Sequence, residues 1–386
     1  LLFYLNTKFN GVCVMAYTTV DDSSANLQIA TYTGNGSNPR NITNDCNSDW
    51  QPDLVWLKNR TDNSTDFVLA NSSIGWDAPR GQGYPWENGP FGGQLASNSN
   101  GAASTPQATY GYVSAALTDG FTAAAGGTNG DTVNKNSKDF VAWQWKANGG
   151  TTSTNTDGTI TSTIQANTDA GFNIVTYTGN GANSNFAHGM GEQPDMVIVK
   201  NRTSAANWCV WHKNLTSSYY MQLDTTISQQ SGPWDGLDPS SGVVYIYSGG
   251  LVNASGSNYV AYIFKGKQGY SKFGKYTGNG NANGTFVYTG FKPAFIMVKK
   301  SNNTGSWVIN DSKRIGHNPN NYDLYANLTG AEEDNDRFDL LSNGFKARST
   351  SSPSNTLSDS YIYMAFAENP FVTSGGAPAT ARALTG

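Results

Sequence analysis

Apolar and polar positions follow one order in this chain, and the order recurs three times. Each copy begins with Tyr-Thr-Gly-Asn-Gly, at residues 32–36, 177–181 and 276–280. A proline then opens an apolar run that closes with lysine, at 52–58, 194–200 and 293–299, and the tyrosine precedes the proline by 20, 17 and 17 residues. Short apolar runs bounded in this way predict strands that are covered on both faces. The chain is therefore an internal array, which favours a scaffold or binding role over catalysis.

A second apolar pattern closes each copy. Alternating strands are predicted at 140–146 and 259–265, and a looser match follows at 361–366. In the first of these, Val141, Trp143 and Trp145 fall on one face, whereas Ala142 and Gln144 fall on the other. Turn residues separate nearly all the apolar runs, and no segment sustains a helical period. The predicted fold class is all-β, with three tandem β-sandwich repeats of jelly-roll or concanavalin-like type.

An aromatic residue follows each proline at a nearly constant distance. It is Phe67, Trp208 or Trp307, at offsets of 15, 14 and 14 residues. This common spacing predicts that the three copies superpose. We expect the strand residues Trp56, Val197 and Ile296 to face cores or sheet interiors.

The repeats divide the chain into five predicted segments. These are an N-terminal extension (1–15), a first β-sandwich repeat with an aromatic insertion (16–149), a second repeat (150–269), a third repeat (270–372) and a C-terminal tail (373–386). Residues 148–155 are predicted to be a flexible link, whereas 265–269 join the second and third copies directly. Met15 resembles a natural start, so we expect residues 1–14 to be upstream sequence or the end of a longer chain. Repeats of about 100 residues are expected to fold alone.

Composition and charge exclude several classes of protein. Only 13% of the 386 residues are charged, aromatics make up 12%, and the formal net charge is −4. No basic stripe is present, which argues against nucleic-acid binding. No apolar run approaches the ~18 residues of a membrane helix. The cysteines, Cys13, Cys46 and Cys209, are isolated and odd in number, so unpaired thiols are expected.

Acidic residues and histidines give no catalytic or metal-binding pattern. A glycosidase needs two carboxyl groups across a cleft, and no such pairing is evident among Glu87, Glu192, Glu332, Glu333 and Glu368. The acidic run 332–336 is predicted to be a solvated loop rather than a calcium site. His188, His212 and His317 lack zinc-ligand spacing. No catalytic residue, no metal and no cofactor is expected.

Two further repeated residues have simple structural interpretations. Asp53 and Asp195 directly follow the prolines, where a carboxylate is expected to accept backbone N–H groups in the entering turn. Lys58 and Lys200 close the same strands, where we expect an ordinary solvated charge.

The most informative surface candidate is the aromatic insertion of the first copy. It contains Trp76, Tyr84 and Trp86 on a Gly/Pro-rich stretch. Exposed aromatic side chains on loops stack on sugar rings or anchor protein contacts. These three residues are the predicted contacts for a ligand or partner. The alternative is that the insertion folds back over its own sandwich.

Three segments carry a family resemblance. They are Met-Ala-Tyr-Thr-Thr-Val-Asp-Asp (15–22), Gln-Pro-Asp-Leu-Val-Trp-Leu-Lys-Asn-Arg (51–60) and Tyr-Ile-Tyr-Met-Ala-Phe-Ala-Glu-Asn-Pro-Phe (361–371). Together with the repeats, they resemble the repeat-bearing, tail-fibre-like virion structural proteins of tailed phages of marine bacteria. The resemblance covers 15 to about 382 and implies a virion protein built from β-sandwich repeats. The third copy departs from the pattern with Ala294 and with Lys300-Ser301.

The expected function is a non-enzymatic phage virion structural protein, in a tail fibre or a receptor-binding appendage. It would lie on the virion surface after assembly in the host cytoplasm. The alternatives are a capsid decoration protein and a glycan-active enzyme on a β-sandwich. The expected partners are other virion proteins and a host surface glycan, without nucleic acid or membrane insertion. A homo-oligomer is expected, with a trimer favoured.

Overall fold

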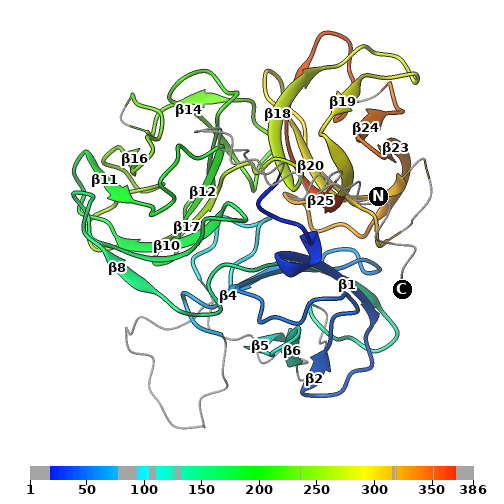
Figure 1. Cartoon of the computed structure of the whole chain (residues 1–386), viewed down its shortest axis with the longest axis horizontal. Coiled ribbons are helices and arrows are strands. Elements are labelled where there is room, and N and C mark those ends of the chain that lie inside the picture. The colour runs from blue at the N-terminus through cyan, green and yellow to red at the C-terminus, as the bar shows by residue number, and fades with distance from the viewer. Residues whose placement is uncertain are drawn as a thin grey trace, which may run out of the picture.

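The structure is a computed structural model, and it confirms the all-β fold class. It describes residues 18–76, 94–103, 110–124, 126, 132–234, 236–314, 318, 320–350 and 352–370. These residues contain 25 strands and a single 3-10 turn, η1 (Ser23–Ala25). The strands form several antiparallel sheets, arranged as three lobes around a common centre (Figure 1).

The first copy contains two sheets. The larger has the order β1 (Leu27–Thr33), β7 (Asp139–Trp145), β3 (Leu54–Asn59) and β4 (Val68–Asn71). The smaller has the order β2 (Arg40–Ile42), β6 (Phe121–Ala124) and β5 (Tyr112–Ala116).

The second copy contains one long sheet and one separate pair of antiparallel strands. The long sheet has the order β15 (Gln230–Ser231), β14 (Tyr219–Gln222), β13 (Cys209–His212), β12 (Met196–Asn201), β17 (Asn258–Phe264), β10 (Phe172–Thr178), β9 (Ser162–Asn167) and β8 (Ser153–Asn155). The pair consists of β11 (Ser184–Ala187) and β16 (Val243–Ile246).

The third copy is a single eight-stranded sheet that curls towards a barrel. Its order is β18 (Ser271–Thr277), β25 (Ser360–Pro370), β20 (Phe291–Lys300), β21 (Trp307–Asp311), β22 (Asn320–Tyr325), β23 (Glu333–Leu341), β24 (Gly344–Ala347) and β19 (Phe286–Tyr288). The end strands β18 and β19 each pair with one neighbour. The barrel therefore has a seam between them.

A four-strand unit recurs in all three copies. Its order is β1-β7-β3-β4 in the first, β10-β17-β12-β13 in the second and β18-β25-β20-β21 in the third. The registers also correspond, because Trp56 faces Trp143 across the strands, Ile198 faces Tyr262 and Met297 faces Met364. The repeated apolar runs therefore occupy matching central strands, as their sequence predicted.

The Tyr-Thr-Gly-Asn-Gly segment is a fixed turn, and the second copy shows its parts. The Tyr177 hydroxyl donates to the Val252 carbonyl at 2.6 Å, and its ring stacks on Tyr259 with centroids 5.0 Å apart. Asn253, which follows Val252 in the chain, is buried, and its side-chain amide donates to Asn180 Oδ1 at 3.0 Å. A Cβ atom on Gly179 would lie 2.3 Å from the Ala254 carbonyl oxygen. Gly181 has φ +74°, a backbone conformation that glycine adopts readily.

The other two copies repeat this arrangement. The matching tyrosine bonds are Tyr32 to Val133 and Tyr276 to Ser354, and the matching buried asparagines are Asn134 and Asn355. Packing and hydrogen bonding within each copy thus explain the repeated Tyr-Thr-Gly-Asn-Gly motif.

Both faces of each central strand are buried. Val197 and Val199 point into the second copy's own hydrophobic cluster. Their neighbours Met196 and Ile198 point the other way, into a cluster that contains residues of all three copies. Ile296 lies in the third copy's own cluster, whereas Trp56 lies in the shared one. The predicted burial of Trp56, Val197 and Ile296 is confirmed.

An aromatic triangle lies at the middle of the shared cluster. It consists of Trp145, Phe264 and Phe366, one residue from the closing strand of each copy. The ring centroids are 6.4 Å apart for Trp145 and Phe264, 5.8 Å for Trp145 and Phe366, and 6.1 Å for Phe264 and Phe366. All three pairs meet edge to face, a favourable geometry for aromatic rings. The three copies thus close on one another rather than forming a string.

The predicted flexible link between the first two copies is not supported. Residues 153–155 form β8, which pairs with β9 in the long sheet of the second copy. The preceding turn is fastened by hydrogen bonds to Asp53, described below. Consequently the link between the first and second copies has a defined conformation.

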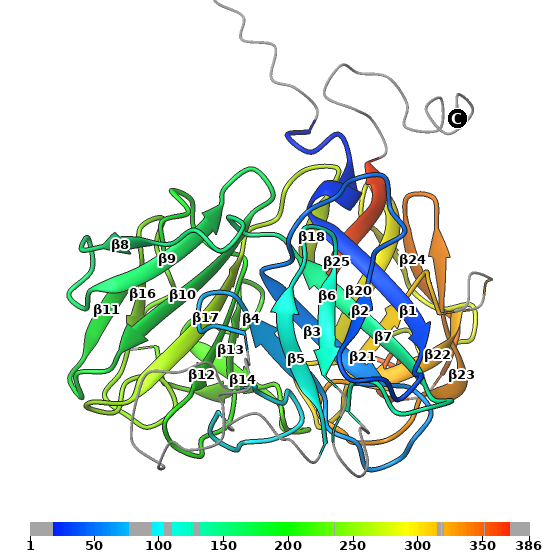
Figure 2. The ribbon, with the colours of Figure 1, turned by 90° about the horizontal axis from the view of Figure 1, so that it is seen from below.

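Both ends of the described body lie on the same side. Figure 2 shows η1 and the end of β25 together at the top of that view. The strands β1 and β3 run away from that end, so the repeated glycine turns lie at the opposite end of the body.

Candidate functional site

Asp53 fastens the link that leads from the first copy to the second. Its carboxylate accepts the backbone N–H groups of Ala147, Gly149 and Gly150 at 2.7–2.9 Å, and the Ser72 hydroxyl at 2.7 Å. The expectation that this aspartate accepts backbone N–H groups is confirmed, although the groups belong to the link rather than to the entering turn.

Asp195 performs the same task for the next link. It accepts the N–H of Gly266 at 2.7 Å, and Lys213 lies 3.1 Å away. The third copy has Ala294 at this position, so it lacks the carboxylate that the first two copies use at their links.

Three buried lysines connect the copies near the end of the central strands that lies away from Asp53 and Asp195. Lys58, Lys200 and Lys299 occupy matching positions, and each side chain is buried. Each also lies over the ring of the repeated aromatic residue, at 5.3 Å from Phe67, 5.9 Å from Trp208 and 6.0 Å from Trp307. The prediction that Lys58 and Lys200 are solvated was wrong. We call these three residues the core lysines.

The core lysines donate to backbone carbonyls of a neighbouring copy. The distances from Nζ are 3.0 Å from Lys58 to Thr329 O, 2.8 Å from Lys200 to Asn100 O and 2.8 Å from Lys299 to Ile227 O. The first copy thus holds the third, the third holds the second, and the second holds the first. This closed cycle fits the common centre seen in Figure 1.

Backbone hydrogen bonds follow the same cycle. Ala103 N donates to Arg202 O, Gln229 N to Ser301 O, and Glu332 N to Arg60 O, at 2.9–3.0 Å. The segments that provide these donors belong to the variable middle part of each copy. These segments do not align with one another when the sequences of the three copies are compared. The sequence did contain one indication of these contacts between copies. A lysine is present at this position in all three copies, although a solvated strand end would tolerate other residues.

Burial changes the acidity of the core lysines. Removal from water lowers the pKa of Lys58 and of Lys299 to about 7, and that of Lys200 to about 8. Nearby carboxylates, Asp62 and Asp66 for Lys58, act in the opposite direction. In spite of these pKa values, the lysines face carbonyls and aromatic rings rather than an open cleft, which indicates a structural role.

A second cycle of polar contacts lies across the shared cluster. One polar residue of each copy takes part, and the three occupy matching positions in the registers. Asn71 lies opposite Leu54, His212 opposite Met196 and Asp311 opposite Phe295. The Asn71 side chain donates to the Tyr262 hydroxyl at 2.9 Å. His212 Nε2 lies 3.2 Å from the Tyr363 carbonyl oxygen, and Trp143 Nε1 donates to Asp311 at 3.0 Å.

His212 is neutral in this arrangement. Burial lowers its pKa to about 3. Its Nδ1 accepts the N–H of Asn214 at 3.2 Å, so Nε2 carries the proton and donates to the carbonyl. His188 is bound in a similar way by Ser240 and Met190, and burial lowers its pKa as well. His317 lies outside the described residues.

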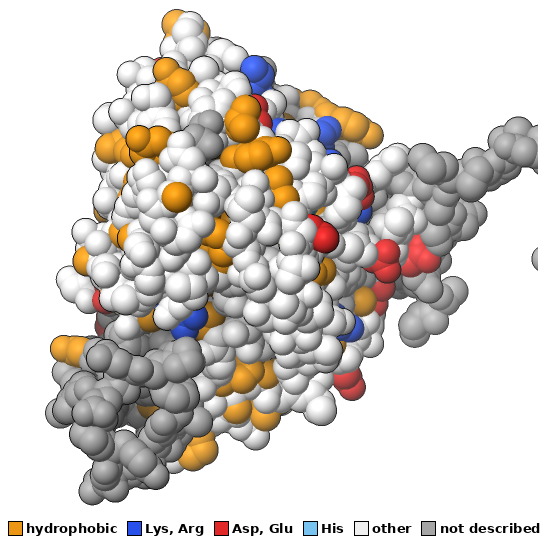
Figure 3. All heavy atoms as spheres, turned by 90° about the vertical axis from the view of Figure 1, so that its left-hand side faces the viewer, with side chains coloured by type: hydrophobic (Ala, Val, Ile, Leu, Met, Phe, Trp, Pro, Cys, Tyr) orange, Lys and Arg blue, Asp and Glu red, His pale blue; other side chains and the backbone are white. Residues whose placement is uncertain are grey.

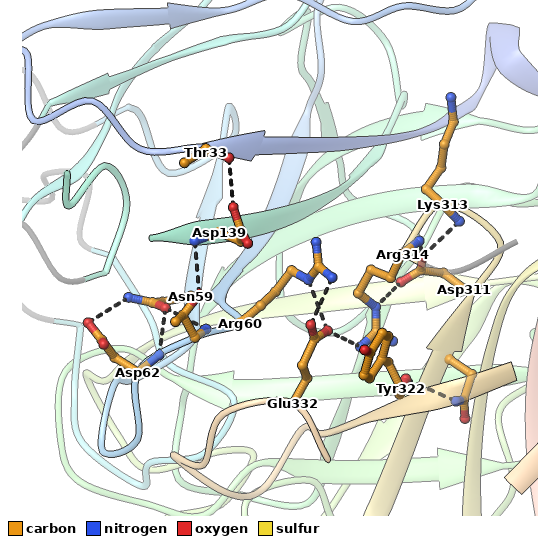
Figure 4. Close-up of polar contacts among 12 residues, drawn as sticks. Thr33, Asn59, Arg60, Asp62, Asp139, Asp311, Lys313, Arg314, Tyr322 and Glu332 are labelled. Carbon is orange, nitrogen blue, oxygen red and sulfur yellow. Dashed lines mark hydrogen bonds and ion pairs between the residues drawn. The ribbon is translucent and has the colours of Figure 1, made fainter. Parts of the chain in front are cut away.

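The acidic run 332–336 is only partly the solvated loop that we predicted. Glu332 bridges Arg60 at 2.8 Å and Arg314 at 3.5 Å, as Figure 4 shows. Arg314 in turn binds the buried Asp311 at 2.7 Å. Glu333 begins strand β23. The run therefore supplies an ion pair between the first and third copies.

The described residues offer no metal centre. Among them, no group of three or more His, Cys, Asp or Glu is placed to hold a metal ion. Three of the described glutamates pair with cations: Glu332 as above, Glu192 with Lys267 at 2.7 Å and Glu368 with Lys292 at 2.5 Å. Within the same ranges no helix is long and apolar enough to cross a membrane. Cys46 and Cys209 are free thiols, and Cys13 lies outside these ranges.

The predicted aromatic site is only partly described. Trp76 is partly buried and packs against the hydrophobic cluster of the first copy. This position favours the alternative that the start of the insertion folds back on its own copy. Tyr84 and Trp86 lie outside the described residues.

A groove of about 470 Å³ lies where the second and third copies meet. It follows the seam between β18 and β19. Its described lining includes Lys213 and Asn214 from the second copy, together with Lys272, Gly274, Lys275, Phe286, Tyr288 and Tyr363 from the third. Sequence reasoning missed it, because its residues come from four separate stretches of the chain.

The groove combines positive charge with exposed aromatic rings. Three lysines line it, and none of the described lining residues is acidic. Phe286 and Tyr288 are 45% and 55% exposed, whereas most large apolar side chains of the described ranges are buried. On the side of the second copy that Figure 3 shows, charged side chains are scattered singly among polar and apolar ones. The groove is therefore a chemically distinct part of the surface.

The comparisons with known proteins give one family. The model of a family described as a domain of unknown function (DUF7483) matches residues 22–370. The chain belongs to this family. No curated protein and no solved structure matches the chain. The family match spans all three copies as one unit, in agreement with their shared cluster.

Proposed function

We propose that this member of the DUF7483 family is a structural protein of a phage virion, in a tail fibre or a receptor-binding appendage. The observation that carries the proposal is the closed cycle of three copies around one core. Such a body is rigid, and both of its described ends lie on one side. A protein tethered at that side would present the opposite side to its surroundings. The sequence resemblance to tail-fibre-like virion proteins supports the same assignment.

We further propose that each copy is a β-sandwich repeat, distorted to different degrees. The first copy is the most similar to a regular β-sandwich. Its four-stranded and three-stranded sheets enclose a hydrophobic cluster that includes Val55, Leu57 and Phe121. In the third copy the equivalent layers are continuous, because one sheet curls back on itself.

The proposal excludes catalysis on glycans. The described glutamates are bound to lysine or arginine side chains or lie in strands, and none of them lines the groove. Purified protein should therefore release no reducing sugar from bacterial or algal polysaccharides. Release that disappears in a Glu192→Gln, Glu332→Gln or Glu368→Gln variant would show that the chain is an enzyme.

The decisive experiment is a cryo-EM map of purified particles of the virus that encodes this chain. The expected result is three-lobed density in a tail appendage that fits residues 18–370. Density on the capsid surface would support the decoration protein instead. Particles that lack the chain, by mass spectrometry and in the map, would refute a virion role altogether.

A further inference from the structure

We propose that the groove between β18 and β19 binds an acidic oligosaccharide, one that carries carboxylate or sulfate groups. The inference deepens the proposed function, because an attachment appendage needs a ligand on the host surface. It is argued from the described residues of the groove, which lie apart from the predicted aromatic insertion.

The seam exists because the third copy lacks a strand that the second copy has. In the second copy, β9 covers the edge of β10 in register from Ser162 to Asn167. The third copy follows directly after the link at 265–269, which is too short to provide such a strand. As a result, β18 pairs with β25 alone and its other side borders the groove.

A pair of residues shapes the floor of the groove. Gly274 faces Tyr363, where the first and second copies have Ala30 facing Ala142 and Val175 facing Ala261. A Cβ atom on Gly274 would lie 2.6 Å from the Tyr363 hydroxyl. The glycine therefore makes room for the tyrosine ring beneath the groove. Burial raises the pKa of Tyr363 to about 12, so its hydroxyl stays a hydrogen-bond donor at neutral pH.

The positive charges of the groove are close together. Lys272 donates to the Tyr288 carbonyl at 2.7 Å and lies 5.0 Å from the centre of that ring. Burial, and then the charge of Lys213, lower the pKa of Lys272. Lys213 also pairs with Asp195 of the second copy at 3.1 Å, and an anion in the groove would add to that carboxylate in neutralising the two lysines. Lys275 is exposed and lines the same groove.

The remaining features select a sugar among anionic ligands. Asn214 lines the groove with an amide side chain, a group that can exchange hydrogen bonds with sugar hydroxyls. Phe286 and Tyr288 are two residues apart on β19 and project to the same side, where the apolar face of a pyranose ring can lie against them. The volume of about 470 Å³ is within the range of small-ligand sites.

The test measures binding of four probes to the purified full chain by calorimetry. They are a sulfated galactan hexasaccharide, an oligogalacturonate of the same length, a neutral galactan hexasaccharide and a hexaglutamate peptide. We expect one or both acidic sugars to bind, more weakly as salt rises, and the neutral sugar not to bind. The two acidic probes distinguish sulfate from carboxylate.

Two variants locate the binding. Lys275→Gln and Tyr288→Ala alter exposed side chains of the groove and should each weaken binding about three- to tenfold. The matched controls are Lys313→Gln, at an exposed ion pair with Asp45, and Tyr247→Ala, at an exposed ring of the second copy, and both should bind as the parent does. Circular dichroism and melting curves confirm that the variants are folded.

Three outcomes would overturn the inference: no probe binds, the groove variants bind as well as the controls, or hexaglutamate binds in place of the sugars. The last would indicate that a peptide adds to the open edge of β18. Because the assay uses isolated protein, its result is independent of whether the chain is found in a virus particle.

Discussion

At the scale of single residues, the repeated glycine turn shows why a short motif is kept three times. Hydrogen bonds of the Tyr177 and Asn253 side chains fix the turn. Gly179 lets the backbone pass close to the Ala254 carbonyl. The requirement is steric, because a side chain at residue 179 has no space. Each part of the motif therefore has an identifiable contact.

Gly179→Ala should lower the free energy of unfolding by about 1–3 kcal/mol, since its Cβ atom would meet the Ala254 oxygen at 2.3 Å. Gly242→Ala is the matched control in the same copy, because nothing lies within 4 Å of a Cβ atom there. Urea denaturation of both variants provides the measurement. Equal stabilities would contradict the steric explanation.

The core lysines predict how stability depends on pH. Because burial lowers the pKa of Lys58 and Lys299 to about 7, from 10.5, the unfolded chain binds more protons than the folded chain between these values. The free energy of unfolding should therefore rise with pH across this window, by about 1 kcal/mol per pH unit for each lysine that fully titrates. Below about pH 7 the contribution of Lys58 and Lys299 no longer changes.

The comparison of variants isolates this effect from other titrating groups. Denaturation is measured between pH 7 and about pH 8.5 for the parent chain, Lys58→Met and the exposed control Lys313→Met. The slope should decrease in Lys58→Met and remain unchanged in Lys313→Met. An unchanged slope in both would mean that Lys58 stays fully charged in the folded protein.

At the scale of elements, the links between copies are as ordered as the strands. The Asp53 carboxylate organises residues 147–150 through three backbone N–H groups. Composition predicted a flexible linker there, because Gly, Thr and Asn dominate the stretch. The prediction failed because one buried carboxylate supplies acceptors that the linker cannot provide for itself.

Replacing Asp53 tests this assignment. Asp53→Ala leaves the N–H groups of Ala147 and Gly149 without an acceptor, whereas Gly150 N–H keeps Gln165 Oε1 at 3.0 Å, and the variant should cost about 3 kcal/mol. Asp195→Ala should cost less, since Asp195 accepts one backbone N–H from its link. Asp157→Ala, at an exposed position, is the control. Hydrogen exchange should accelerate at Ala147 and Gly149 in the Asp53 variant. Unchanged protection of these two amides would refute the role of the carboxylate.

At the scale of the whole molecule, the shared cluster makes three copies into one body. Among the described residues, the apolar faces that carry Trp145, Phe264 and Phe366 lie within one cluster to which all three copies contribute. We had expected repeats of this length to fold alone, and the shared core argues against it. A separate copy would expose a wide apolar face to water.

Calorimetry of the intact chain should consequently show a single cooperative transition. Trp145→Ala should lower the stability of the whole body by about 3–5 kcal/mol rather than that of the first copy alone. A fragment of residues 16–149 should be unfolded or aggregated. Three separate transitions, or a soluble and folded fragment, would show that the copies are independent domains.

The expected trimer remains a prediction at this scale. One chain already arranges three copies around a centre, so the stability of its core does not require other chains. Light scattering of the purified protein measures the state directly. A trimer that persists at low concentration would agree with the expectation, and a monomer would show that the threefold arrangement stays within one chain.

The sequence by itself determined the repeat, the all-β class and the buried strands. These follow from local rules, because the period of side chains along a strand and the turn residues are visible in one dimension. The burial of Val141, Trp143 and Trp145 on one face is an example, since all three lie in the shared cluster as their alternation required.

Only the tertiary structure decided what lies opposite each buried face. The same alternation is satisfied by copies that fold alone and by copies that close on each other, so the cycle of core lysines was invisible. The groove between β18 and β19 was equally hidden, because it depends on a strand that the third copy lacks and on Asn214 from the second copy. Contacts between distant segments depend on packing in three dimensions, and a local pattern does not specify its partner.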